Sequence, residues 1–555
     1  MDFESRQSRT IFSPTMALVA TFAFVATVAA RAADVPTPGA VREQVQPRPV
    51  APAPSPAAPA VEAPKPRPAL APGGPAILVS RFVISGNSVI STADLEAQIA
   101  SYQGRRLTLA EIYGVADTLT DYYHKAGYSL AQVTVPAQNV SSGVIKLEVL
   151  EGRVGEISFK GNKRYRTELL DEHVTHIAPG GVLTIKALED DLLDLNTLPG
   201  LSARAVVQPG ATYGTSDVVV KTVENPYSLG ASLDNYGRTI IGEWRLQGNA
   251  TINNPFGFGD RLDLNVVHAE GGQLEYGRFN YDAPINRIGT HANVYYSRYN
   301  YKVDTGELGA AFAGIDISGE GDDFGINLTQ PFVRNRVDML YGSIGFERTL
   351  TRQRGLLKKS NDIGLLRLNL YYSHVYANTA VSTLNAEVST NFRGNKDGTQ
   401  NNRQAGKLRV DATHLQPLKY SWALFLRASG VASIDPLVDT ERFRIGGTDS
   451  VRAFPSAELA GDEGIDGSIE LRRPLAWIPG VPLQGRIFYD AGMVYRKQPS
   501  LGEHDMESLS GIGFGLTGRI ARYYAFDVAV VQPTTAYHSS DGRDTRAWFS
   551  FSAAF

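Results

Sequence analysis

Cysteine is absent from the 555 residues of this chain, and its absence removes several kinds of chemistry at once. A protein without thiols has no disulfide framework, no thiolate metal site and no cysteine nucleophile. The lack of cysteine also suits a chain that crosses an oxidising compartment in the unfolded state, because no disulfide can form on the way.

A large excess of one charge and long apolar runs are also absent. The formal net charge is −3, so the chain as a whole has no basic footprint of the kind that binds nucleic acid. Beyond the first 33 residues, no stretch approaches the roughly 18 apolar residues that a membrane-spanning helix needs. If the protein resides in a membrane, it must therefore span it as a β-barrel.

Constellations that would indicate catalysis or a bound metal are missing as well. The nine histidines are scattered, and His173 and His176 are interpreted as surface side chains rather than metal ligands. Asp190, Asp191 and Asp194 are predicted to lie on the exposed face of a helix, where water solvates them. No phosphate-binding loop is present. The sequence thus predicts neither an enzyme nor a metal or cofactor site.

Residues 1–33 have the pattern of a cleaved signal peptide. A short apolar core covers residues 16–30, arginines precede it at positions 6 and 9, and an Ala-x-Ala cleavage pattern ends it at residues 30–32. This core is too short for a comfortable membrane-spanning helix. We therefore expect export from the cytoplasm, with an uncleaved anchor as the alternative.

Residues 34–75 are dominated by proline and alanine. Thirteen of the chain's 30 prolines lie between residues 36 and 75. Such a run lacks both the amide donors and the bulky apolar groups that a core needs, so we predict an extended linker.

One structural unit then occurs twice. A strand ending in a Gly-Asn turn, two helices and two further strands are built around Gly86-Asn87 and again around Gly161-Asn162, 75 residues later. Thr92 is predicted to cap the first helix of the first unit. The two units, residues 76–152 and 153–226, resemble POTRA domains, the periplasmic modules that precede Omp85-type barrels. A pair of unrelated α+β domains is the alternative.

From residue 227 to residue 555 the apolar period changes to two. Leu262 and Leu264, for example, alternate with charged and polar neighbours, and four further segments have the same pattern. At about 20 residues for a strand and its connection, this segment has room for about 16 strands. A soluble β-sandwich would alternate in the same way.

Three features favour an antiparallel transmembrane β-barrel over a sandwich. Aromatic residues crowd the strand ends, as interfacial girdles do, and the polar faces carry Arg, Asp and Asn side chains that suit a wet lumen. The chain also ends in an alternating strand whose terminal aromatic residue, Phe555, resembles the outer-membrane assembly signal.

Two motifs late in this segment are the most specific. One is Val451-Arg452-Ala453-Phe454, after a glycine-rich stretch, and the other is Phe488-Tyr489-Asp490-Ala491-Gly492, within a strand pattern. Together with the signal peptide, the proline-rich lead and the two units, they resemble the TpsB transporters of two-partner secretion. These are the haemolysin secretion/activation proteins of the Omp85 superfamily, and the resemblance covers nearly everything after residue 76.

The resemblance implies a lock between a loop and the barrel wall. In this family the sixth extracellular loop, here around residues 441–465, folds back into the barrel as a lid. Its tip arginine, here Arg452, pairs with a wall aspartate, here Asp490. Because a loop in a wet lumen has little apolar surface to bury, the forked ion pair would supply both position and energy. The usual glycine after the arginine is Ala453 here, so either the backbone needs no positive φ or the tip is slightly remodelled.

Two other charged residues are expected near this loop. Glu470 and Arg472 are predicted to face the lumen, as charged residues do in many barrels, without a specific role. Arg452 and Asp490 have the alternative interpretation of separate, solvated charges.

The resemblance implies an outer-membrane protein translocase rather than an enzyme. It would export a large secreted β-helical partner, such as an adhesin or haemolysin, from the periplasm to the surface of a Gram-negative cell without ATP. Outer-membrane lipids, the barrel assembly machinery and periplasmic chaperones are further implied partners. The closest alternative is an Omp85-type factor that assembles other barrels. A passive porin would lack the two units, and a glycan-binding or hydrolytic barrel lacks support from paired carboxylates.

Gln132, Val133, Thr134 and Val135 of the first unit are the predicted docking site for the unfolded partner. The two valines alternate with polar neighbours, and Pro136 would end any pairing. We expect this segment at a sheet edge, where an unfolded chain can add as an extra strand. The composition of the proline-rich lead does not reveal whether it contains the plug helix found in some relatives.

Overall fold

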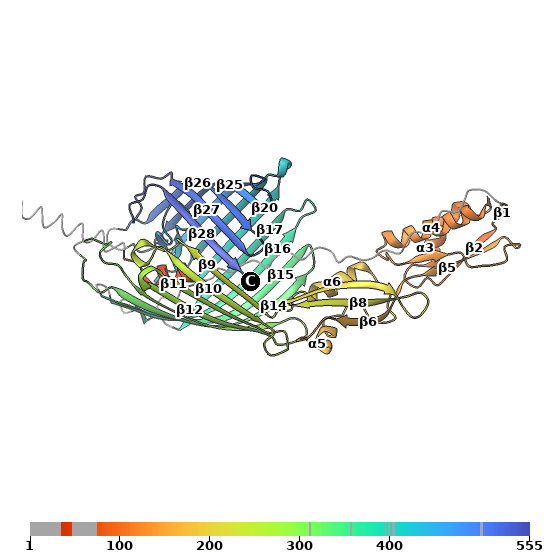
Figure 1. Cartoon of the computed structure of the whole chain (residues 1–555), viewed down its shortest axis with the longest axis horizontal. Coiled ribbons are helices and arrows are strands. Elements are labelled where there is room, and N and C mark those ends of the chain that lie inside the picture. Colours follow the sequence, from red (N-terminus) through yellow and green to blue (C-terminus); the bar gives the residue numbers. More distant parts are fainter. Residues whose placement is uncertain are drawn as a thin grey trace, which may run out of the picture.

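The computed structural model describes residues 35–46, 75–309, 312–355, 358–393, 396–397, 400–401, 406–499 and 503–555. The predicted signal peptide and most of the predicted linker lie outside the described residues. Two α+β units follow one another in a line away from one end of a large β-barrel, which makes the molecule elongated (Figure 1).

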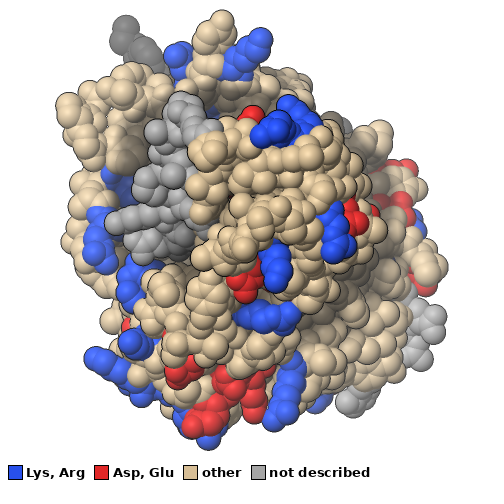
Figure 2. All heavy atoms as spheres, turned by 90° about the vertical axis from the view of Figure 1, so that its right-hand side faces the viewer, with Lys and Arg blue, Asp and Glu red and all other residues tan. Residues whose placement is uncertain are grey.

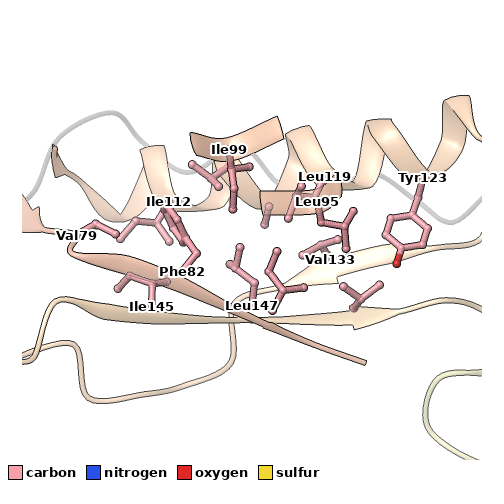
Figure 3. Close-up of a cluster of buried hydrophobic side chains, with 14 of the residues drawn as sticks. Val79, Phe82, Leu95, Ile99, Ile112, Leu119, Tyr123, Val133, Ile145 and Leu147 are labelled. Carbon is pink, nitrogen blue, oxygen red and sulfur yellow. The ribbon is translucent and has the colours of Figure 1, made fainter. Parts of the chain in front are cut away.

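The first unit is a three-stranded sheet covered by two helices on one face. Its central strand, β5, pairs in parallel with β2 and antiparallel with β4. Apolar side chains from the helices and the sheet meet between the two layers (Figure 3). Its elements are β1 (Ile77–Leu78), β2 (Arg81–Ser85), α3 (Thr92–Ile99), η1 (Ala100–Tyr102), β3 (Arg106–Leu107), α4 (Leu109–Lys125), β4 (Gln132–Thr134) and β5 (Val144–Leu150).

The helices of the first unit begin at hydrogen-bonding caps. Thr108 and Glu111 form a reciprocal capping box at the start of α4. The cap of α3 is Ser91, whose side chain accepts from the amide of Asp94, so the prediction that Thr92 caps this helix was wrong by one residue. Thr92 instead accepts a hydrogen bond from the turn that precedes the helix.

The second unit repeats this order. Its central strand, β8, pairs in parallel with β6 and antiparallel with β7. Its elements are β6 (Arg153–Lys160), α5 (Thr167–Asp171), α6 (Ile185–Leu195), β7 (Leu201–Pro209) and β8 (Thr215–Glu224).

The Gly-Asn turn of the first unit is held by a glutamate from the end of the sheet. Gly86 has a φ of +85°, and a Cβ atom there would lie 2.3 Å from the carbonyl oxygen of Val149. Glu151 accepts from the amides of Ser88 and Val89. Burial alone would raise the pKa of Glu151, but these donors outweigh it, and its pKa lies below the ordinary value.

The second unit contains the same device. Asn162 donates to Tyr165 and Thr167, as Asn87 of the first unit donates to the residues three and five positions later. Glu224 accepts from the amides of residues 163–165. Burial raises the pKa of Glu224, but the hydrogen bonds from these amides together lower it by more, so its pKa lies below the ordinary value. The 75-residue repeat therefore preserves a charged turn as well as an order of elements.

The three aspartates of α6 are not simply solvated, contrary to the sequence prediction. Asp191 is 1% exposed and accepts from the amides of residues 175–177 at 2.9 to 3.0 Å. Asp194 pairs with Arg334 of the barrel at 2.9 Å, while Asp190 pairs with a lysine of its own helix. The connection between the two helices folds back over this face of α6, which helical periodicity alone does not reveal.

Within the described residues, sixteen antiparallel strands form a closed barrel in which the last strand pairs with the first. These strands are β9 (Tyr227–Asp234), β10 (Arg245–Asn253), β11 (Arg261–Ala269), β12 (Leu274–Pro284), β13 (His291–Lys302), β14 (Ser318–Arg334), β15 (Asp338–Arg354), β16 (Lys359–Val375), β17 (Val381–Arg393), β20 (Lys407–Pro417), β21 (Ala423–Ser433), β24 (Glu463–Leu475), β25 (Leu483–Tyr495), β26 (Met506–Ile520), β27 (Tyr524–Pro533) and β28 (Arg546–Ala554). Shorter elements of the connections are η2 (Thr239–Ile241), η3 (Glu270–Gly272), β18 (Lys396–Asp397), β19 (Gln400–Asn401) and η4 (Lys419–Ser421).

The barrel is apolar outside and polar inside. Leu366, Leu368 and Leu370 of β16 point outward and are each more than one-third exposed, while Arg367 and Asn369 between them face the lumen. This polarity fits a barrel that sits in a lipid bilayer. None of the helices in the described residues is long and apolar enough to cross a membrane.

The second unit contacts the barrel at the short turns that connect strands on its own side. Arg287 pairs with Glu172 at 2.9 Å, and Arg336 pairs with Glu189 of α6 at 3.2 Å. The pair of Arg334 and Asp194 lies in the same contact. Figure 2 views the molecule from the end where the first unit lies, and basic and acidic side chains are interspersed on that face.

Candidate functional site

The lid loop, predicted around residues 441–465, spans residues 434–462 in the structure, where it connects β21 to β24 and folds into the lumen. After η5 (Asp439–Glu441), two short strands pair with each other, β22 (Phe443–Ile445) and β23 (Leu459–Gly461), and hold the tip between them. The two glycines that follow β22 have φ values of +108° and +95°, a region that glycine adopts at little cost.

The tip of the lid loop is a turn that presents Arg452 to the barrel wall. The amide of Phe454 closes this turn by donating to the carbonyl of Val451 at 3.2 Å. Nε and Nη2 of Arg452 donate to the two carboxylate oxygens of Asp490 on β25 at 2.8 and 2.6 Å. The amide of Arg452 adds a third bond to Asp490 at 3.1 Å. The structure thus brings together the two residues that the motifs paired.

Four further residues surround Arg452. Its Nη1 donates to Glu470 at 2.6 Å, and its Nη2 also donates to Ser468 at 2.8 Å. The centroid of the Phe488 ring lies 3.4 Å from the guanidinium carbon, and the indole of Trp548 donates to the carbonyl of Arg452 at 2.7 Å. Glu470 was predicted to lie near the lid loop without a specific role, and contacts of Ser468 and Trp548 with Arg452 were not predicted. Strand register, which sets Ser468 opposite the wall aspartate, is the signal that finds it.

Burial makes the electrostatics of this network important. Asp490 is 0%, Glu470 is 4% and Arg452 is 7% exposed. Arg472 also donates to Glu470, at 2.8 Å, so two arginines face two carboxylates. With so little water, each charge depends on its protein partners, and removing one partner leaves another charge buried and unpaired.

The tip also buries apolar surface, which the sequence argument did not expect. Val451, Ala453 and Phe454 are all 0% exposed. They pack with Phe488 and Trp548 in one apolar cluster that joins the loop to the wall. The premise that the loop has little apolar surface to bury was therefore wrong, because this part of the lumen wall is itself apolar. Packing and the ion pair together set the position of the tip.

Ala453, at the position of the usual glycine, needs no unusual backbone. It is not among the described non-glycine residues with positive φ. Its methyl group meets the wall instead: a Cβ atom on Gly511 of β26 would lie 2.4 Å from the Cβ of Ala453. The space for the alanine is thus provided by a glycine on the opposite surface. Gly492 of the wall motif is similarly confined, because its Cβ would lie 3.0 Å from that of Asp466.

A second contact, the outer latch of Glu458, Ser540 and Arg238, holds the outer end of the lid loop. Glu458 accepts from the amide and the hydroxyl of Ser540 at 2.7 and 2.6 Å. Arg238 lies 3.6 Å from Glu458 and donates to the carbonyl of Ala457 at 3.2 Å. Arg238 follows the first barrel strand and Ser540 precedes the last, so the outer latch joins the lid loop to both sides of the barrel closure.

A helix occupies another part of the lumen. It is α2 (Pro38–Val45), and it lies within residues 34–75, so the prediction of an extended linker was wrong for these eight residues. Pro38 stands in the first turn, where its missing amide hydrogen costs nothing, and Thr37 caps the helix. The next proline, Pro47, lies beyond the end of the helix.

Arg42 attaches α2 to the wall and to the lid loop at once. Its Nε donates to Asp323 of β14 at 3.0 Å, and its Nη2 pairs with Glu347 of β15. Its Nη1 lies 3.7 Å from Glu441 of the lid loop. Arg42 is 6% exposed, so this triple contact is shielded from water.

The lid loop also caps the N-terminus of α2. Asp439 accepts from the hydroxyl of Thr37 at 2.8 Å and from the amide of Gly39 at 2.7 Å. A carboxylate at this end of a helix is favourable, because the amides there carry partial positive charge. A Cβ atom on Gly39 would lie 2.4 Å from Arg444, so the contact has no room for a side chain. The helix and the lid loop therefore hold each other in the lumen.

The other predicted site residues lie away from this network. Gln132, Val133 and Thr134 form β4, an edge strand of the first sheet, and Val135 lies beyond its end. Phe555 follows the last strand and exchanges two backbone hydrogen bonds with Leu229 of the first barrel strand. Among the described residues, no group of three or more His, Asp or Glu side chains is arranged to hold a metal.

Comparisons with known proteins agree with this architecture. A family model described as haemolysin secretion/activation protein ShlB/FhaC/HecB matches residues 214–518, more than half of the chain. A second model, the ShlB-type POTRA domain, matches residues 77–152. The chain is 24% identical over 472 residues to the heme/hemopexin transporter protein HuxB of Haemophilus influenzae (strain 86-028NP), which covers 80% of this chain and 81% of the relative.

Two solved structures have a similar fold. CdiB from Escherichia coli matches with a TM-score of 0.65 and 21% identity over 88% of this chain and 93% of that chain. BamA from Haemophilus ducreyi, lacking its POTRA domains 1–3, matches with a TM-score of 0.53 and 14% identity over 86% of this chain and 100% of that chain. Because the family model matches more than half of the chain, including most of the closed barrel, the chain belongs to the haemolysin secretion/activation family, the outer-membrane transporters of two-partner secretion.

Proposed function

We propose that this transporter exports an unfolded partner through the barrel lumen, and that α2 and the lid loop must both leave the lumen for a chain to pass. The observation that supports the proposal is the shared network in which Arg42, Asp439 and Glu441 tie the helix to the lid loop. The arrangement is a closed resting state held by ion pairs and by the apolar packing of α2 and of the lid-loop tip. Such pairs can be exchanged for new partners without unfolding the barrel.

Export needs no ATP in this proposal. The periplasm has no ATP, and the sequence has no phosphate-binding loop. The partner would be a large secreted β-helical protein of the adhesin or haemolysin type, and its folding outside the cell would make the passage irreversible. The family description, haemolysin secretion/activation, supports this class of partner.

The partner would first dock in the periplasm at an edge of the first sheet. β4 is an edge strand, but α4 already engages part of it: the amide of Val133 donates to Thr120 at 3.0 Å, and His124 contacts the carbonyl of Ala131 at 2.9 Å. A strand that adds to β4 must displace these bonds. The other edge strand of the sheet is β2.

Site-specific photocrosslinking separates the two edges. A crosslinker at Thr134 of β4 is expected to capture the secreting partner, whereas one at Ser85 of β2 serves as the matched control on the opposite edge. Capture at Ser85 alone would move the docking site to β2.

Channel recordings test the closed state. Arg42→Ala removes the side chain that joins α2 to two strands and to the lid loop, so we expect the open state to become at least about tenfold more populated. Arg42→Lys keeps one charge but cannot form the forked contacts, and should give an intermediate value. A population equal to that of the unaltered protein in both variants would contradict the proposed role of α2.

The fold is also similar to that of BamA. This similarity raises an alternative function, the assembly of other outer-membrane barrels. The family model favours secretion. Cells that lack this transporter should therefore lose their secreted partner while the amounts of other outer-membrane barrels stay unchanged. A general loss of barrels would support assembly instead.

A further inference from the structure

The outer surface of the barrel changes character near the loop ends of β13–β16. On β14 the outward residues Leu328, Ile326 and Phe324 are each about two-fifths exposed, and the next outward residues are Asp322 and Glu320. An apolar belt of this kind covers about 25 Å of a membrane barrel. The charged residues therefore begin where the hydrocarbon of the outer leaflet ends.

Four arginines gather on this wall, and we call them the outer arginine band. They are Arg298 of β13 and Arg348, Arg352 and Arg354 of β15. Their side chains are 47%, 42%, 73% and 68% exposed, in that order. All four alternate with lumen-facing residues, so they point away from the barrel toward the surrounding membrane.

The positive charges of the outer arginine band outnumber the negative charges of the carboxylates that pair with it. Glu320 is shared by Arg298, Arg354 and Arg352 at 2.9, 3.1 and 3.8 Å. Asp322 also lies 3.3 Å from Arg298, and Asp362 pairs with Arg348 at 3.0 Å, so three carboxylates face four guanidinium groups. Lys302, exposed on the same face of β13, adds a further positive charge.

The band is confined to one side of the barrel. At the loop end of β17 the outward residues are Val388, Thr390 and Phe392, and at the loop end of β25 they are Met493 and Tyr495. A uniform rim that only kept the barrel upright would carry charge on every wall. The asymmetry indicates a ligand with its own charge.

We propose that the outer arginine band binds the phosphate groups of the acidic glycolipid in the outer leaflet. The guanidinium fork matches two phosphate oxygens, and a group at the edge of a membrane is desolvated more than one in bulk water. The lipid's acyl chains would lie along the apolar belt directly below, on Leu328, Ile326 and Phe324. The band would then fix the depth and orientation of this wall while the lid side of the barrel stays free to move.

Lipid binding to the purified full-length transporter in detergent tests this proposal. The probes are bisphosphorylated lipid A, dephosphorylated lipid A with the same acyl chains, and inorganic phosphate. We expect native mass spectrometry to detect tight binding of the bisphosphorylated lipid only, and the same lipid to raise the temperature at which the barrel unfolds on gels. Equal binding of the dephosphorylated lipid would overturn the proposal, because acyl chains alone would then explain it. Equal protection by inorganic phosphate would show a general anion effect and would overturn it as well.

The triple variant Arg298→Gln, Arg352→Gln and Arg354→Gln locates the site. We expect its affinity for bisphosphorylated lipid A to fall at least tenfold, and lysine at the same three positions to restore part of it. Arg473→Gln is the matched control, since Arg473 is an exposed arginine at the opposite, turn end of the barrel. Heat-modifiability confirms that each variant is folded. Undiminished binding by a folded triple variant would overturn the assignment.

Discussion

At the scale of single residues, Arg452 concentrates the contacts that hold the lid loop. Its side chain reaches Asp490, Glu470 and Ser468, and its backbone carbonyl accepts from an indole. A buried ion pair gains little over well-packed apolar groups of the same size, because both charges lose their water. Breaking the pair nevertheless costs free energy, because the remaining charge stays buried without a partner. A contact that adds little net stability but is costly to break is better suited to switching between states than to stabilising the fold.

We predict that Arg452→Ala abolishes secretion while the barrel still assembles. The variant leaves Asp490 and Glu470 with fewer partners in a nearly dry site, which costs roughly 3–5 kcal/mol of lid-loop seating. The barrel ladder does not depend on the loop, so heat-modifiability should stay normal. Secretion of the partner and channel conductance are the two measurements.

The reversed pair, Arg452→Asp with Asp490→Arg, provides the control for direct contact. It should recover part of the activity, although the inverted groups will not reproduce every bond to Glu470 and Ser468. Full secretion by Arg452→Ala would refute the lock.

The contact between Ala453 and Gly511 gives a second prediction. Gly511→Ala places two methyl carbons within 2.4 Å, so the tip must shift and secretion should fall several-fold. Ala453→Gly removes one of the two methyl groups and should rescue the first variant, because the pair is coupled. The carbonyl of Gln532 also lies 3.1 Å from the new Cβ, which makes the rescue partial. Secretion that stays low in the double variant would place the strain in the strand rather than in the tip.

The site could be predicted from the sequence only where a motif marks it. Arg452 and Asp490 belong to such motifs, whereas Glu470, Glu458 and Glu441 look like the many other carboxylates of a polar lumen. Their partners come from strands and loops far apart in the chain. Only the register of the barrel and the path of the lid loop bring them together.

At the scale of elements, regular periodicity was the reliable guide. The barrel and the repeat were predictable, because alternation and the repeated Gly-Asn turn persist over many residues. The helix α2 was not, because thirteen prolines nearby hide eight residues whose helix is stabilised by tertiary contacts of Arg42. The prediction that Asp191 is exposed was wrong for the same reason, because a loop outside the helical pattern covers it.

The charged turns of the two α+β units lead to a pH prediction. Glu151 and Glu224 have pKa values below their ordinary one, so their bonds stabilise the units at neutral pH. This stability is lost as the pH falls below the ordinary value of 4.5 and through the lowered pKa of each carboxylate.

Variants separate this effect from other acid effects. Glu151→Gln should destabilise the first unit by about 1–3 kcal/mol at pH 7 and flatten its response to acid, and Glu224→Gln should do so for the second unit. Hydrogen exchange of the full-length protein, measured at neutral and at acidic pH and corrected for the intrinsic exchange rate, reports the stability of each unit separately. An unchanged acid response in both variants would assign the transition to other groups.

At the scale of the whole molecule, the barrel is closed by its shortest ladder. Five residue pairs join β28 to β9, whereas β25 and β26 share thirteen. Asn235 extends this closure at one end with bonds to Ala547 and Phe549. Phe555 extends it at the other end through Leu229.

Deletion of Phe555 should therefore slow assembly. The variant loses two backbone hydrogen bonds and the ring that stacks on Tyr523 at 5.5 Å, in a closure that has few bonds to lose. We expect unfolded barrel to accumulate severalfold in pulse–chase experiments, with Phe555→Tyr as the control that keeps the ring and the bonds. An unchanged rate would count against both the assembly signal and the importance of the closure.

The three pairs that attach the second unit to the barrel have a consequence for habitat. In each one the barrel supplies the arginine and the unit supplies the acid; Arg287 is 80% and Arg336 is 45% exposed, whereas Arg334 is only 21% exposed. Exposed pairs contribute about 0–1 kcal/mol each and weaken as salt shortens the Debye length from about 30 Å at 0.01 M to about 3 Å at 1 M. Small ions cross the outer membrane freely. The salinity outside the cell therefore sets how firmly the two α+β units, which together form a periplasmic arm, are held against the barrel. Because this chain has no cysteine, one cysteine can be introduced into the arm and one into the barrel, and each can carry a spin label. The distribution of distances between the two labels should broaden as the salt concentration rises. A constant distribution would mean that the arm is fixed by other contacts.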